Sequence, residues 1–240
     1  LTIMRGYIEV FEDELTESLN SEQTQFMHNM SASAQQLAAF VSSILNVARI
    51  EENALFLHLK EENIKNVLEE ACKNMQLRAR VHDKNIILQV DDNLPKVAID
   101  KVSIFLVMNN LIDNAIKYTH TKEDITIRTT LKDGTIETTV SDKGIGIDSN
   151  VIEHVFDKFY RAHKSKNSIG GTGLGLYLTK AIIDAHGGKI WVKSKEGQGS
   201  TFGFTVPIYS DIANQIKDNQ NKEIVRGAHG WIKNHTLYRG

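Results

Sequence analysis

The chain has 240 residues, enough for one large domain or two smaller ones with buried cores. Apolar residues make up 41% and charged residues 24% of the composition, which is typical of a soluble globular protein and not of a disordered or membrane-embedded one. The 28 basic and 30 acidic residues leave a net charge of −2. No general field would therefore attract nucleic acid or anionic lipid, and we expect no nucleic-acid partner.

The single cysteine, Cys72, excludes an internal disulfide framework and fits a reducing compartment, so we expect a cytoplasmic location. The longest strictly apolar run, 104–108, is far shorter than the ~18–20 residues that cross a bilayer. We expect membrane attachment only through a segment upstream of this sequence. The chain opens Leu1-Thr2-Ile3-Met4 without a signal peptide or an initiator methionine, which predicts a fragment of a longer protein.

Residues 1–54 carry apolar positions at alternating spacings of three and four, which predicts two helices separated by a polar break at Asn20-Ser21. The first stripe contains Leu1, Met4, Ile8, Phe11 and Leu15, and the second contains Met27, Met30, Ala34, Leu37, Val41, Ile44 and Ala48. Two helices cannot cover both sides of such stripes, so we expect a homodimeric four-helix bundle. The alternative is a hairpin packed on the rest of its own chain.

Residues 55–209 mix strand and helix periods. Alternating residues indicate strands at 55–59 and 86–90, and one-sided apolar faces indicate helices at 64–75, 101–118 and 173–185. Turn signals at 132–134 and 196–199 predict two hairpins. Hairpins among helices favour an α/β sandwich with a mixed sheet and helices on one face. Residues 210–240 are polar without a clear period, and we expect a flexible or foreign tail there.

Asn110, Asn114 and Lys117 share one face of the helix expected at 101–118, because they fall at positions i, i+4 and i+7. Amide oxygens and an ammonium on one face suit a hydrated Mg²⁺ with phosphate, since Mg²⁺ takes oxygen ligands and keeps several waters. The same pattern is also typical of a merely solvated helix face, so by itself this segment does not decide between the two.

Two glycine-rich segments follow. The segment 142–146, DKGIG, comes just after an expected strand, where a carboxylate can accept a hydrogen bond from a purine amino group; the alternative is an Asp-Gly turn. The segment 170–176, GGTGLGL, opens a helix whose free N–H groups favour phosphate oxygens. It matches neither the dinucleotide-binding fingerprint nor the P-loop.

A long connection, 147–170, separates these segments and contains FDKFYR at 156–161. Connections of this length inside a compact domain are usually functional or mobile, so we expect a lid, with a hydrophobic plug as the alternative. A fourth segment, GQGSTF at 197–202, is by itself only a hairpin turn.

The order of these segments resembles one family. NLIDNAIKYT, DKGIG, FDKFYR, GTGLGL and GQGSTF follow one another like the N, G1, F, G2 and G3 boxes of sensor histidine kinases, and the resemblance covers about residues 1–208. It implies that 1–54 is the dimerisation and histidine-phosphotransfer hairpin. It also implies that 55–209 is the catalytic ATP-binding domain, an α/β sandwich of the GHKL (Bergerat) type shared with gyrase, Hsp90 and MutL ATPases.

The resemblance also implies roles for single residues. Asp142 would bind the adenine amino group, and Gly144 and Gly146 would shape the pocket around it. Asn114 would place its amide oxygen on Mg²⁺, and Arg161 would steady the transferring γ-phosphoryl group. The remaining residues assigned to the nucleotide are Asn110, Lys117, Tyr118, Gly171, Gly173, Leu174 and Gly175.

The family's phosphoacceptor pattern, similar to H-E-x-x-T-P, does not occur in this sequence. We expect it directly upstream of Leu1, and we expect the chain as given to bind Mg-ATP without phosphorylating itself. The implied function is a protein-histidine kinase that passes a phosphoryl group from ATP to a histidine and then to a response-regulator receiver domain. The alternatives are an ATP-binding scaffold or pseudokinase, and another GHKL ATPase. We interpret His186 as a helix C-terminal residue near the last carbonyls.

Overall fold

The computed structural model describes residues 6, 20–52, 57–120, 122–161, 171–217, 224–227 and 230–231. The chain divides into two compact units, Leu1–Ala48 and Arg49–Gly240. The first expected helix, apart from Gly6, and the strand start at Leu55 lie outside the described residues. Within the described part of the chain, no helix is both long enough and apolar enough to cross a membrane.

Helix α2 (Ser21–Glu51) begins at the expected break. The Asn20 side chain accepts the N–H of Gln23 at 2.9 Å, and the Gln23 side chain accepts the N–H of Asn20 at 3.0 Å. This reciprocal capping box satisfies two N–H groups that a helix start leaves open. Many apolar side chains of α2 remain exposed in the single chain, among them Phe26, Met30, Leu37, Val41, Ile44 and Leu45.

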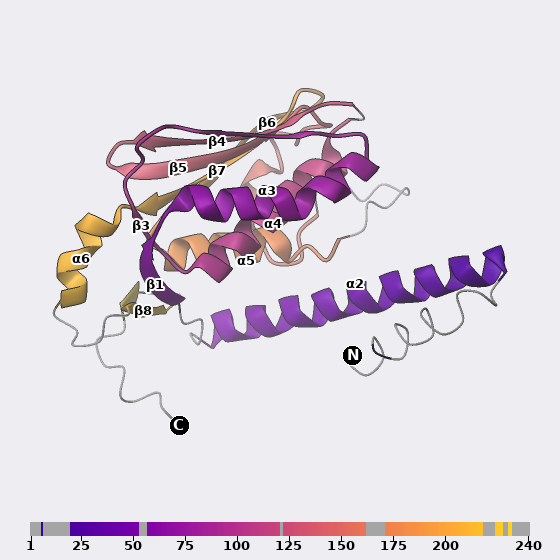
Figure 1. The fold of residues 1–240 in the computed structure, drawn as a ribbon, viewed down its shortest axis with the longest axis horizontal. Coiled ribbons are helices and arrows are strands. Elements are labelled where there is room, and N and C mark those ends of the chain that lie inside the picture. Colours follow the sequence, from indigo (N-terminus) through magenta and orange to yellow (C-terminus); the bar gives the residue numbers. More distant parts are fainter. Residues whose placement is uncertain are drawn as a thin grey trace. The chain divides into compact units, whose positions relative to one another are not determined.

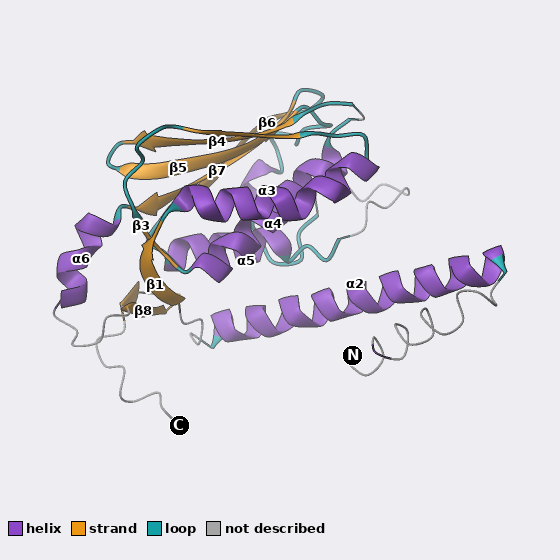
Figure 2. Ribbon diagram, viewed as in Figure 1, coloured by secondary structure: helices purple, strands orange, loops and turns teal. Residues whose placement is uncertain are grey.

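A five-stranded sheet forms one layer of the second unit, with helices on one side of it (Figure 1 and Figure 2). Its order is β2 (Ile86–Val90), β4 (Ile125–Lys132), β5 (Thr135–Asp142), β7 (Gly199–Pro207) and β6 (Ile190–Lys195). Strands β2 and β4 are parallel and the other pairs are antiparallel, so the sheet is mixed as expected. Asp133 and Gly134 join β4 to β5 with φ values of 49° and 73°. Two positive φ values in a two-residue turn are the type I′ geometry that matches strand twist.

Three helices cover one face of this sheet: α3 (Ile64–Val81), α4 (Lys101–Tyr118) and α5 (Gly175–Ala185) (Figure 1). Their apolar faces and the inward residues of the strands form one core, in which Leu68, Met108, Ile112 and Phe204 are fully buried. Burial of this apolar surface is the main force that holds the helices on the sheet. The expected α/β sandwich with helices on one face is confirmed.

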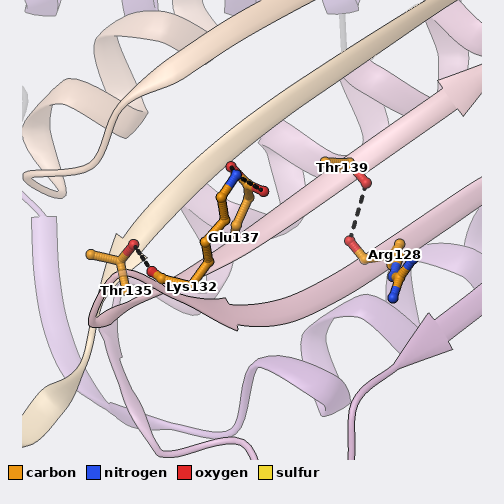
Figure 3. Close-up of polar contacts among 5 residues, drawn as sticks. All are labelled: Arg128, Lys132, Thr135, Glu137 and Thr139. Atoms are coloured by element: carbon orange, nitrogen blue, oxygen red, sulfur yellow. Dashed lines mark hydrogen bonds and ion pairs between the residues drawn. The ribbon is translucent and has the colours of Figure 1, made fainter.

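The opposite face of the sheet is polar. On it the Lys132 ammonium pairs with Glu137 at 3.1 Å, and Thr139 donates to the carbonyl of Arg128 at 3.4 Å (Figure 3). A depression of about 270 Å³ lies here, lined by Arg128, Thr130, Glu137 and Thr139. Because side chains alternate along β5, Asp142 points to the other face, the one that the helices cover.

A second, four-stranded sheet has the order β3 (Val97–Ile99), β1 (Leu57–Glu62), β8 (Ile224–Gly227) and β9 (Gly230–Trp231). Helix α6 (Tyr209–Lys217) precedes β8. Ile212 of this helix is buried in a small cluster with Leu57 and Leu59. The start of the expected tail, 210–240, is therefore folded. Ile212 is an apolar residue in a polar stretch, and it packs in a cluster with residues of β1, which lies far earlier in the sequence.

His186, directly after α5, ties two helices together. Its Nδ1 bonds the carbonyl of Ile182 at 2.7 Å, and its Nε2 accepts the N–H of Asp100 at 3.0 Å. The Asp100 side chain in turn caps the start of α4 by accepting the N–H of Ser103 at 3.0 Å. The imidazole is fully buried. It contacts a carbonyl of the last helical turn as expected, and it also holds the start of α4, a contact that the sequence does not reveal.

Candidate functional site

Helix α4 presents the side chains that the sequence singled out. Its apolar stripe packs into the core, and Asn110 and Asn114 lie half-buried one turn apart on another face. The Asn110 amide donates to the carbonyl of Gly175 at 3.4 Å and to Thr179 Oγ1 at 3.5 Å. Asn110 therefore fixes the first turn of α5 against α4.

The end of α4 is joined to the segment after β5. The N–H of Ile145 donates to the carbonyl of Tyr118 at 3.1 Å, and Thr119 forms a β-bridge with Gly144. A Cβ atom on Gly144 would lie 2.0 Å from the Tyr118 carbonyl oxygen. Only glycine permits this approach, so two sequence segments are brought into backbone contact.

Asp142 ends β5 in a half-buried position beside this junction. Its Oδ1 accepts the N–H of Gly144 at 2.8 Å and that of Ser200 at 3.3 Å. Burial raises the pKa of Asp142, whereas these two N–H groups, and then Lys84 and His120, act to lower it. No described residue donates a hydrogen bond to Oδ2, so this oxygen remains an acceptor for a ligand.

The hairpin turn at 197–200 closes the other side of Asp142. Gly199 has a φ of 95°, and a Cβ atom there would lie 2.1 Å from the Asp142 carbonyl oxygen. Ser194 donates to the Gly199 carbonyl and accepts the N–H of Ile147, both at 2.8 Å. Ser200 was not among the predicted site residues, although the GQGSTF segment that contains it was the available signal.

The glycine-rich segment before α5 leaves that helix without a side-chain cap. Gly173 has a φ of 71°, and a Cβ atom on it would lie 2.7 Å from the backbone of Phe159. Leu174 is fully buried, so its side chain packs in the core and only its backbone can face a ligand. Gly171 is exposed and Gly175 opens the helix, while Gly170 lies outside the described residues.

The FDKFYR segment, 156–161, packs beside the glycine-rich segment that precedes α5. Phe156 contacts Phe202 edge to face with ring centroids 6.3 Å apart, and the N–H of Phe159 donates to the Gly173 carbonyl at 3.0 Å. Burial raises the pKa of Tyr118, and the positive charge of Arg161 opposes that rise, so these two residues lie within electrostatic range. The segment is thus anchored to the glycine-rich segment. The rest of the expected lid, 162–170, lies outside the described residues.

Lys117 has an acidic partner. Its ammonium lies 2.6 Å from Asp113 Oδ2, and the Arg78 guanidinium of α3 lies 2.8 Å from Asp113 Oδ1. Asp113 therefore holds Lys117 along the helix.

No group of three or more His, Cys, Asp or Glu side chains is placed to hold a metal ion among the described residues. Asn114, half-buried on α4, carries an amide oxygen, which is a type of donor that a divalent cation can take. This fits Mg²⁺ held together with phosphate oxygens and water better than an all-protein metal cage.

Comparison with known proteins identifies this arrangement. The family described as "Histidine kinase-, DNA gyrase B-, and HSP90-like ATPase" matches residues 99–210. Sensor histidine kinase WalK of Bacillus subtilis is 30% identical over 210 residues, which are 86% of this chain and 34% of WalK. The chain spans between 27% and 54% of the length of the first curated relatives that it matches.

Solved structures with a similar fold also include histidine kinases. Full-length ShkA in complex with AMPPNP has a TM-score of 0.72 and 25% identity, covering 85% of this chain and 42% of ShkA. The catalytic domain of the histidine kinase ThkA has a TM-score of 0.55 and 29% identity, covering 62% of this chain and 95% of that domain. ThkA in complex with the response regulator protein TrrA, with 23% identity and a TM-score of 0.62, covers 84% of this chain and 56% of that chain and shares the fold. Residues 99–210 thus match the histidine kinase-, DNA gyrase B- and HSP90-like ATPases, and over most of its length the chain is a homologue of sensor histidine kinases.

Proposed function

We propose that this chain is the ATP-binding, catalytic part of a protein-histidine kinase in a two-component system. The observation that carries the proposal is the state of Asp142: one carboxylate oxygen is held by two backbone N–H groups, and the other receives no hydrogen bond from a described residue. A fixed, half-buried acceptor of this kind fits the exocyclic amino group of adenine and rejects a 6-oxo purine, which presents another acceptor.

The phosphates belong at the start of α5 and along α4. The uncapped N–H groups of α5 and the positive end of its dipole favour phosphate oxygens, and no acidic residue occupies the first turn. Asn110 holds this turn in place, and Asn114 and Lys117 lie on α4 at the following turns. Mg²⁺, when bound with the nucleotide through the Asn114 amide, would neutralise charge on the phosphates.

Arg161 is the residue that we assign to the transferring phosphoryl group. It ends the anchored FDKFYR segment and lies in electrostatic range of Tyr118 at the end of α4. A guanidinium placed there stabilises charge on phosphoryl oxygens, which is the main protein contribution to this chemistry. The acceptor would be a histidine in a H-E-x-x-T-P context, and the phosphoryl group would pass next to an aspartate of a response regulator. The ThkA–TrrA complex, in which a histidine kinase of the same fold binds a response regulator, supports this second step.

We further propose that α2 pairs with the same helix of a second copy. Its apolar side chains Met30, Leu37 and Ile44, at heptad spacing, are exposed by 53%, 46% and 42% in the single chain. A stripe of this kind is buried by a partner helix.

Two measurements test the kinase proposal. Calorimetry with the non-hydrolysable analogue AMPPNP and Mg²⁺ should show binding to this chain, and D142N should weaken that binding by roughly 10- to 100-fold. A chain in which a H-E-x-x-T-P segment is fused before Leu1 should gain acid-labile, alkali-stable label from γ-labelled ATP, and its His→Ala version should not. Binding without any such label would favour the ATP-binding scaffold, and turnover of ATP without label would favour another ATPase of the family.

A further inference from the structure

The Asp113 carboxylate of α4 lies between two cations. Its Oδ2 is 2.6 Å from the ammonium of Lys117, one turn further along the same helix, and its Oδ1 is 2.8 Å from Nη2 of Arg78 on α3. The contact with Lys117 is a pair that helical spacing favours. The contact with Arg78 joins two helices and adds a second positive charge, so the group has one cation more than its carboxylate needs.

The packing of α3 beside α4 holds Arg78 at this position. One turn earlier on α3, the Asn74 amide donates to Asn109 Oδ1 of α4 at 3.5 Å, so positions 74 and 78 of α3 face positions 109 and 113 of α4. Ala79, the neighbour of Arg78, is fully buried in the core. In the sequence, Arg78 is only a basic residue in the last turn of a helix, outside every motif segment.

The Asp113 carboxylate needs a counter-charge because it is largely removed from water. Its side chain is 22% exposed, and its Oδ1 atom is buried and accepts no hydrogen bond from a described residue. The Arg78 guanidinium therefore acts on this oxygen as a neighbouring charge. A carboxylate in such a position is costly when it has no cation close to it.

The second cation decides whether Lys117 is available to a ligand. Lys117 is 27% exposed and shares a helix face with Asn110 and Asn114, where we place the phosphates of the nucleotide. With Arg78 present, Lys117 can turn from Asp113 to a phosphate oxygen and leave behind a carboxylate that is still paired. Without Arg78, the same movement would leave an unpaired carboxylate near an anionic ligand, and that carboxylate would compete with the phosphates for the ammonium.

We propose that Arg78 is a positioning residue for phosphate recognition: it neutralises the Asp113 carboxylate, so that Lys117 can leave this carboxylate and bind the phosphates. The inference rests on the proposed function, since it takes Lys117 as a ligand of the phosphates. Arg78 acts through Asp113 and makes no contact with the nucleotide. The arrangement favours a polyphosphate ligand over a nucleoside, because only the polyphosphate can replace the carboxylate as the partner of Lys117.

The test measures two ligands on each variant. AMPPNP with Mg²⁺ carries the phosphates and is titrated by calorimetry, whereas adenosine carries only the base and the sugar and is titrated by NMR chemical shifts, which also report weak binding. The variants are R78M, K117M, D113N and the double variant R78M/D113N. R80M is the matched control, because Arg80 is exposed on the same helix and pairs with no acidic side chain among the described residues. Circular dichroism and thermal unfolding check that each variant folds.

R78M should bind AMPPNP about tenfold more weakly than the wild-type chain, which is the order of magnitude that an interaction with a charged group contributes. It should bind adenosine as the wild type does. D113N removes the competing carboxylate and should bind AMPPNP at least as tightly as the wild type. In that background the loss should disappear, so that R78M/D113N matches D113N. R80M should match the wild type with both ligands.

Other results would overturn the role of Arg78. A parallel loss of AMPPNP and adenosine binding in R78M would show that the residue only supports the fold. An equal loss in R80M, or an equal loss when R78M is added to D113N, would show that positive charge attracts the phosphates without acting through Asp113. Loss of AMPPNP binding in D113N would show that the carboxylate assists the phosphate site. Where R78M does not fold, R78Q takes its place.

K117M separates this inference from the proposed function. Loss of AMPPNP binding in K117M, with wild-type binding in R78M, contradicts only the role of Arg78. Wild-type AMPPNP binding in K117M contradicts the placement of the phosphates along α4, and with it the proposed nucleotide site.

Discussion

The N–H of Ser200 donates to Oδ1 of Asp142 at 3.3 Å, across 58 residues of sequence. Ser200 follows the β6–β7 turn and Asp142 ends β5, and the two residues are directly paired in the β5–β7 ladder. The β6–β7 turn has no special feature in the sequence. It nevertheless lines one side of the site, because the antiparallel pairing of β5 with β7 places Ser200 beside the Asp142 carboxylate.

D142N should lose most of its affinity for ATP. Asparagine keeps Oδ1 as an acceptor for Gly144 and Ser200, but it turns a donor toward the adenine amino group. Loss of a hydrogen bond to a charged group costs about 1.5–3 kcal/mol, or roughly 10- to 100-fold in affinity. The variant should also improve binding of inosine triphosphate relative to ATP, because a 6-oxo group accepts from the amide. Calorimetry with both nucleotides measures this ratio, and an unchanged ratio would contradict the assignment.

The stability of the domain should depend on pH through the same carboxyl group. The pKa of Asp142 is raised in the folded state, chiefly by burial. Its contribution to the free energy of unfolding is therefore fully present below the ordinary aspartate pKa and is lost as pH rises through the folded-state pKa. D142N should lack this loss. Urea unfolding of the wild-type chain and D142N across that pH window gives the difference, which should grow in favour of D142N as pH rises.

G173A should destabilise the domain and weaken nucleotide binding. Alanine at a φ of 71° costs roughly 1–2 kcal/mol, and its Cβ would also press on the Phe159 backbone, 2.7 Å away. G171A is the matched control for stability, since a Cβ there meets nothing within 4 Å. Chemical denaturation should place G171A near the wild type and G173A well below it. Equal losses would mean that the contact between Gly173 and Phe159 is unimportant.

H186A should lower the free energy of unfolding by about 2–4 kcal/mol, because it leaves a cavity at a fully buried position and an unsatisfied, part-buried N–H at Asp100. H82A is the control. His82 is exposed and ends α3 through its backbone, so its side chain should matter by less than about 0.5 kcal/mol. Thermal unfolding of both variants makes the comparison.

L37D should convert a dimer to a monomer while leaving AMPPNP binding intact, because a charge in the α2 stripe cannot be buried against a second copy. A39D is the matched control. It introduces the same charge at an exposed position on the opposite side of α2, where heptad spacing puts solvent, and should not change the association state. Sedimentation velocity distinguishes the outcomes. A wild-type chain that is already monomeric at micromolar concentration would contradict the pairing of α2.

Much of the fold follows from local patterns. Strand β2 and helix α4 have the bounds that alternation and apolar periodicity predict, and the Asp133-Gly134 turn has the geometry that its residues favour. These features depend on interactions between residues that are a few positions apart, so the local sequence determines them without tertiary contacts. The order of the motif segments is likewise a property of the sequence alone, and it indicates the sensor histidine kinases.

Tertiary structure decided the rest. The burial of Lys84, the pairing of Arg78 with Asp113 and the contact of Ser200 with Asp142 each depend on elements that meet only when the sheet and helices pack. A polar side chain in a turn has the same local sequence whether it is solvated or buried. Its surroundings, and with them its charge state and role, are set by residues far away in the chain, because long-range packing and not local propensity determines which polar groups lose water.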